Sequence, residues 1–71
     1  MYTVAYKVDD YITIEFCNND DELLNLLCSM LYNDDIEDLD AAFAEIENTM
    51  EYDPDFSMTI VDSRGREIFK I

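Results

Sequence analysis

The side chains of this sequence best suited to chemistry are eight carboxylates between residues 34 and 51, with no lysine or arginine among them. They are Asp34, Asp35, Glu37, Asp38, Asp40, Glu45, Glu47 and Glu51. Carboxylates three or four residues apart on a helix project from Cβ atoms about 5–6 Å apart. The phosphates of a nucleic acid strand repeat on a similar scale, with one charge per about 3.4 Å of axial rise. The segment is therefore predicted to present a phosphate-like row of charge that a basic protein groove can bind.

The whole chain is acidic, and this excludes some partners. Its 71 residues include 18 acidic side chains, 4 basic ones and no histidine, for a formal net charge of −14. Thirteen of the acids and no base lie in residues 20–55. Direct binding to nucleic acid is excluded, because that affinity comes from basic side chains. A purely solubilising role for the acids is the alternative, since charge runs usually form solvated faces. However, a net charge of about 2–8 already suffices for a small domain.

Other chemistry has little support in the sequence. Residues 34–40 superficially resemble a calcium-binding loop, but the sixth position is Leu39 where such loops need glycine. Cys17 and Cys28 are separated by ten residues, form no metal-ligand spacing and have no histidine to activate them. We expect both to be reduced, partly buried thiols. The sequence thus predicts no enzyme, no metal site and no cofactor.

Two alternating segments at the start of the chain predict strands over residues 2–8 and 12–17. The turn between them can contain two residues or three. A three-residue loop, 9–11, places Val8 opposite Ile12 and Val4 opposite Phe16, so that all apolar side chains share one face. Because register usually follows the hydrophobic pattern, we expect the three-residue loop.

Two helices are predicted next. The first spans residues 20–32, with Asn19 as N-cap, Glu22 in a capping box and Asn33 as the C′ residue. The second begins at Asp34 or Asp35 and runs to about Glu51, before Pro54 ends it. Its apolar positions recur at helical spacing: Ile36, Leu39, Phe43, Ile46 and Met50.

Two further strands complete the predicted fold. Residues 56–61 alternate with Phe56, Met58 and Ile60 on one face, and residues 67–71 follow a turn at 62–66, with Phe69 and Ile71 inward. The chain is thus predicted to be a single domain, residues 1–71, of the α+β class. Its order is ββααββ, with a four-stranded antiparallel sheet and two helices packed on one face.

In size, net charge and the acidic segment 34–51, the chain resembles the phage-encoded inhibitors of bacterial defence, notably anti-CRISPR proteins and anti-restriction DNA mimics. The resemblance implies an inhibitor that occupies the DNA- or RNA-binding channel of a defence complex, foremost a CRISPR effector. Arg64 and Arg66 depart from a uniformly acidic decoy, and either face away from the partner or pair with an acidic rim.

A second hypothesis is an acidic adaptor or antitoxin-like module that recognises a basic partner protein through a shaped interface. Tyr11, Tyr32 or Tyr52 would then serve as aromatic anchors, whereas the alternative places the tyrosines at the core edge. With no signal peptide and no apolar run long enough for a membrane helix, we expect a complete small protein. It should be cytoplasmic in a host bacterial cell, without membrane contact, and a monomer or weak homodimer.

Overall fold

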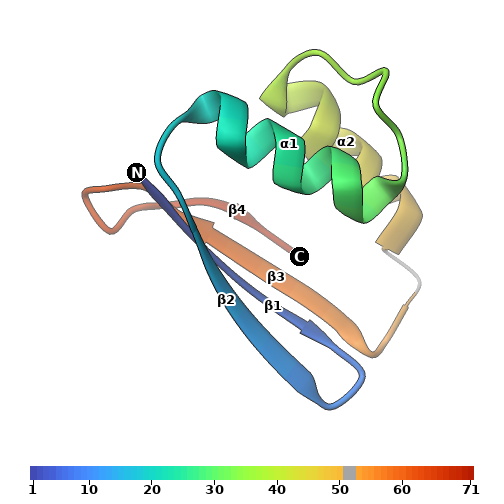
Figure 1. The fold of residues 1–71 in the computed structure, drawn as a ribbon. Coiled ribbons are helices and arrows are strands. Elements are labelled where there is room, and N and C mark those ends of the chain that lie inside the picture. Colours follow the sequence, from blue (N-terminus) through green and yellow to red (C-terminus); the bar gives the residue numbers. More distant parts are fainter. Residues whose placement is uncertain (51–52) are drawn as a thin grey trace.

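The computed structural model describes residues 1–50 and 53–71, which form an antiparallel four-stranded sheet with both helices on one face (Figure 1). The elements are β1 (Tyr2–Val8), β2 (Tyr11–Cys17), α1 (Asp20–Leu31), α2 (Leu39–Met50), β3 (Phe56–Val61) and β4 (Glu67–Lys70). This confirms the predicted α+β class and the ββααββ order. No helix within the described residues is long and apolar enough to cross a membrane.

The strand order is β2-β1-β3-β4, so the first and last hairpins are joined at the centre of the sheet by β1 and β3. There Val4 lies opposite Ile60 and Tyr6 opposite Met58. β2 and β4 are the two edge strands. The face away from the helices, here called the open face, has no layer of secondary structure over it within the described residues (Figure 1).

The core lies between the sheet and the helices. Its fully buried side chains include Leu23 and Leu27 of α1, Ile46 of α2, and Met58 and Ile60 of β3. The predicted inward faces of the last two strands are confirmed, because Phe56 and Phe69 are also buried and Ile71 packs against the core. Of the stripe predicted for the second helix, Ile46 is buried and the other members are partly buried against the core.

The predicted three-residue loop between the first two strands is wrong. Val8 lies opposite Tyr11, which leaves a two-residue turn at Asp9 and Asp10. Asp9 adopts a left-handed backbone with φ 55°, as tight hairpin turns require, because such turns match the twist of the strands. The Asp9 N–H also donates to the carbonyl oxygen of Asp55 at 3.0 Å. Turn geometry therefore overrides the hydrophobic pattern in setting the register.

This register shift turns the apolar residues of β2 outward. Ile12, Ile14 and Phe16 lie on the open face, with 72%, 58% and 65% of their surfaces exposed. The core does not require them, because Leu23 and Leu27 of α1 fill the space above this end of the sheet. The result is an exposed apolar stripe along one edge of the sheet.

α1 begins as predicted and ends one residue early. The Asn19 side chain accepts a hydrogen bond from the Glu22 N–H at 2.9 Å, which confirms the N-cap. At the other end, Tyr32 takes the left-handed conformation, with φ 53°, in place of Asn33. The Asn33 N–H then bonds to the Cys28 carbonyl at 3.1 Å, which closes the helix.

The predicted start of the second helix is also wrong, because α2 begins at Leu39 and residues 33–38 are not helical. Asp38 caps α2, with its Oδ1 accepting from the Ala41 N–H at 2.7 Å. The two helices run in nearly the same direction (Figure 1), so the chain must return along the full length of α1. A 12-residue helix is about 18 Å long, and residues 32–38 can cover that distance as non-helical chain, which advances by up to about 3.3–3.6 Å per residue. A helix over 34–38, advancing only about 1.5 Å per residue, would shorten this reach.

Candidate acidic interface

The structure divides the predicted acidic residues between two settings. Four lie in the connection between α1 and α2: Asp34, Asp35, Glu37 and Asp38, all exposed. Asp40, Glu45 and Glu47 lie on α2 and are also exposed. Glu51 lies outside the described residues. The predicted row on one continuous helix is therefore wrong for the first four, because they precede α2 and are not helical.

The acidic segment, defined as residues 34–38, is held in place by contacts on both sides. The Asn33 Oδ1 accepts from the Asp35 N–H at 3.0 Å, and the Cys28 thiol donates to the Ile36 carbonyl at 3.7 Å. Ile36 itself is partly buried against the core. With Ile36 turned inward as the anchor, the four carboxylates point to solvent from a fixed backbone.

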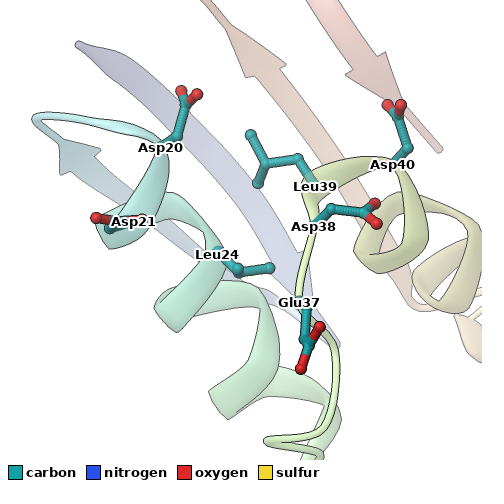
Figure 2. A pocket seen from close by; sticks show the side chains of 7 residues that line it. All are labelled: Asp20, Asp21, Leu24, Glu37, Asp38, Leu39 and Asp40. Carbon is teal, nitrogen blue, oxygen red and sulfur yellow. The ribbon is translucent and has the colours of Figure 1, made fainter.

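A cavity of about 280 Å³ lies where the starts of the two helices meet. Figure 2 shows Leu24 and Leu39 extending into the space between the two helix starts, with carboxylates at its margin, of which that of Asp21 points away from the space. These carboxylates belong to Asp20, Asp21, Glu37, Asp38 and Asp40. An apolar floor with an acidic rim suits the alkyl stem and charged end of an arginine or lysine, because such side chains place their stem on apolar surface and their charge in water.

Sequence reasoning missed Asp20 and Asp21 as members of this acidic interface. It assigned them to the first turn of a helix, where acids favour the positive end of the helix dipole. That role holds, since both lie in the first turn of α1. Their proximity to Glu37 and Asp40 depends on the parallel arrangement of the helices, which no local sequence signal encodes.

The parallel helices also explain how the chain tolerates this concentration of charge. Both helix N-termini, each carrying roughly half a positive charge, border the same cavity. Two of the carboxylates have internal partners as well. Asp38 caps α2, and Asp20 accepts a hydrogen bond from the Tyr2 hydroxyl, which raises the pKa of Tyr2.

The basic side chains lie elsewhere. Lys7 pairs with Ile12 and Ser57, and Lys70 with Thr59, which places both lysines on the open face. Within residues 1–50 and 53–71, the one ion pair joins Arg66 Nε to Asp62 Oδ2 at 3.4 Å, inside the β3–β4 turn. Arg66 therefore pairs within its own turn. The acidic side chains of the candidate interface therefore lie on the helix side of the molecule, and both lysines lie on the open face.

The tyrosines fall into two groups. Tyr2 and Tyr6 are partly buried against the core, which agrees with the hypothesis that the tyrosines lie at the core edge. Tyr11 and Tyr32 are almost fully exposed, with Tyr32 at 96%. Tyr52 lies outside the described residues. Tyr32 lies two residues before the acidic segment in the chain.

The two cysteines are buried and unbridged. Burial is the main cause that raises the pKa of the Cys17 thiol, and the negative charges of Glu22 and Glu15 add to it. Over residues 1–50 and 53–71, no three acidic or cysteine side chains are grouped so that they could hold a metal ion. Cysteine nucleophile chemistry gains no support from this arrangement.

No protein-family profile, curated protein or solved structure matches this chain.

Proposed function

We propose that this protein is a nucleic-acid-mimicking inhibitor that occupies the basic DNA- or RNA-binding surface of a bacterial defence complex, foremost a CRISPR effector. The observation that carries the proposal is the exposed, base-free acidic surface formed by segment 34–38 and the start of α2. An inhibitor of this type acts in the cytoplasm of the host bacterial cell, where the defence complex binds its nucleic acid.

The acidic segment 34–38 supports mimicry because it groups four carboxylates with no base among them. Its four carboxylates are exposed and its backbone is fixed at Asn33 and Ile36. A basic groove can therefore bind the segment with little ordering cost, releasing the anions that the groove otherwise holds.

The acidic cavity adds a feature that a plain charge row lacks. An arginine or lysine side chain from the groove can insert between the two helix starts, with its stem against Leu24 and Leu39 and its charge among the rim carboxylates. Such an insertion gives shape specificity to an interaction otherwise driven by long-range attraction.

The test is affinity capture with the purified protein from a bacterial lysate rich in defence systems, eluted with a salt gradient. Mimicry predicts recovery of a nucleic-acid-binding effector that moderate salt releases and added DNA displaces. A partner that resists salt and is indifferent to DNA would contradict mimicry.

A matched pair of variants tests which acids matter. The first, Asp34→Asn, Asp35→Asn, Glu37→Gln and Asp38→Asn, neutralises the segment while asparagine at 38 still caps α2. The control, Asp9→Asn, Asp10→Asn, Asp55→Asn and Glu67→Gln, changes the net charge equally at exposed positions outside the segment. Mimicry predicts that the first variant loses capture by at least about tenfold, and that the control loses far less.

Tyr32 supports one alternative function, an acidic adaptor or antitoxin-like module with a shaped interface to a basic partner. A tyrosine with φ 53° and 96% exposure contributes little to the core and is placed for contact with another molecule. In that case Tyr32→Ser abolishes capture, because a central aromatic anchor dominates such interfaces, whereas neutralising segment 34–38 only weakens it.

A further inference from the structure

The free edge of β2 presents a regular row of backbone hydrogen-bonding groups. The Asp9 N–H points to β3, bonding the Asp55 carbonyl, so the odd-numbered residues of β1 face β3 and the even-numbered ones face β2. In antiparallel ladders, bonded and non-bonded pairs alternate. Val8, Tyr6 and Val4 therefore exchange bonds with Tyr11, Thr13 and Glu15. The N–H and C=O groups of Ile12, Ile14 and Phe16 point outward from the sheet edge.

The two edges of the sheet differ in how they are protected against pairing. β4 has four residues, lies beside a bulge at Ile60 and Val61, and carries exposed charges at Glu67 and Lys70. These features block edge-to-edge pairing. β2 has seven residues in unbroken register with β1, and no proline, glycine or lysine. An edge of this kind is a template for another strand.

We propose that two copies of this chain pair through antiparallel β2 strands, around a two-fold axis at Ile14. In this register Ile14 lies opposite Ile14 of the second copy, and Ile12 lies opposite its Phe16. The outward N–H and C=O groups of both copies are then bonded to one another. The exposed apolar stripes also meet as aliphatic–aliphatic and aliphatic–aromatic pairs, which stabilise neighbouring strands.

The charges on the edge fit a second copy in this register. Glu15 is the one charged residue of β2, and it lies opposite Thr13 of the second copy, so no two carboxylates face each other. The acidic segment 34–38 lies on the helix layer, away from the sheet edge (Figure 1). An acidic partner of other sequence would not place an uncharged residue opposite Glu15 in this way. A basic partner would find only one carboxylate on β2 to bind.

The proposal is tested by mixing two variants that each add one cysteine, Thr13→Cys and Glu15→Cys, under mild oxidation. Directly opposite non-bonded residues have Cα atoms about 4.5 Å apart, within the range of a disulfide. Each variant alone places its new cysteines about 8 Å apart along the strands, beyond that range. The wild-type chain, oxidised alone, measures any contribution of Cys17 and Cys28.

The expected result is a mixed disulfide dimer that exceeds both homodimers by about tenfold. Equal yields of mixed and unmixed dimers would overturn the register. A monomer in sedimentation experiments at all concentrations up to about 1 mM, where about half the chains of even a millimolar complex are dimeric, would overturn the dimer itself. Sheet-on-sheet packing detected by crosslinks between open-face residues would overturn it too.

A second variant separates loss of pairing from loss of folding. Ile14→Pro removes the outward N–H but no bond to β1, and edge strands tolerate proline with that orientation. It should retain the wild-type circular dichroism spectrum and lose the dimer, while Ile14→Val keeps both. A folded Ile14→Pro variant that still dimerises would contradict the proposal.

The dimer does not depend on the proposed inhibitor function, and salt distinguishes the two. Each copy carries −14, so screening should strengthen self-association. Binding to a basic groove should weaken over the same range of salt. Dimerisation that weakens with salt would overturn edge pairing without bearing on the inhibitor.

Discussion

Phe43 of α2 stacks on Phe69 of β4, with ring centroids 4.8 Å apart and ring planes inclined by 15°. Phe69 is buried and Phe43 partly buried. The stack joins the second helix to the last strand of the sheet, and therefore fixes one side of the layer that presents the acidic segment.

Phe43→Leu should lower the free energy of unfolding by about 1–2 kcal/mol, from the lost ring stacking and a partly filled site. Urea denaturation followed by circular dichroism measures the change. Phe16→Leu is the matched control, because Phe16 is 65% exposed on the open face, and its effect in dilute solution should stay within about 0.5 kcal/mol. Equal losses for the two variants would mean that the stack contributes nothing.

Tyr32→Gly should stabilise the protein by about 1 kcal/mol, because glycine removes the steric strain of a left-handed backbone. Little packing is lost, since the tyrosine side chain is 96% exposed. Tyr32→Ala retains a Cβ at φ 53° and should bring no comparable gain. A thermal melt of the three proteins decides the matter, and a less stable glycine variant would show that the tyrosine ring is held by contacts.

Added salt should raise the melting temperature, because it screens repulsion among the carboxylates of a chain with net charge −14. The measurement is a series of thermal melts in sodium chloride, at a protein concentration low enough to keep the chain monomeric. A melting temperature that does not change with salt would indicate that the helix dipoles already balance the acidic cavity.

Asp62 should make stability depend on pH in the acid range. Its Oδ1 accepts from the backbone N–H groups of Arg66 and Arg64, both at 2.9 Å, and these bonds lower the pKa of the carboxyl. A lowered folded-state pKa means that the carboxylate contributes stability above its ordinary value of about 3.9, and that this contribution is lost as the pH falls through the folded-state value.

The stability difference between wild type and Asp62→Asn should therefore be largest near neutral pH and shrink below about pH 4. Urea denaturation at several pH values measures it. Asp55→Asn serves as the control, because the Asp55 carboxylate has no hydrogen-bonding role in the described structure. A difference that persists unchanged into strong acid would mean that the amide itself disrupts the turn.

The elements of the fold were predictable because each has a local cause. Alternation gave the strands, Asn19 capped α1 as expected, and Phe56 and Ile60 face inward. The predicted hairpin register is wrong because it required Ile12, Ile14 and Phe16 to be buried, and all three are exposed. Nothing local reveals that the sheet keeps an open face, nor that Asp9 takes the left-handed conformation needed for the shorter turn.

The acidic interface was predicted in composition but not in geometry. Asp34, Asp35 and Asp38 are all suitable N-caps, and only the need to return along α1 selects Asp38. The same return brings Asp20 of α1 beside Asp40 of α2. Such proximity depends on how the two helices pack against each other. The spacing of residues within one helix gives no information about that packing.

The central pairing of β1 with β3 has a consequence for the order of folding. Val4 pairs with Ile60, although most of the sequence separates the two residues. The hairpins and the helices, by contrast, form from residues close together in the sequence. Closing a loop of this length costs conformational entropy before the contact stabilises anything, and non-local pairing slows folding. The β1–β2 hairpin with α1, and separately the β3–β4 hairpin, should therefore form early, and their joining along β1 and β3 should limit the folding rate.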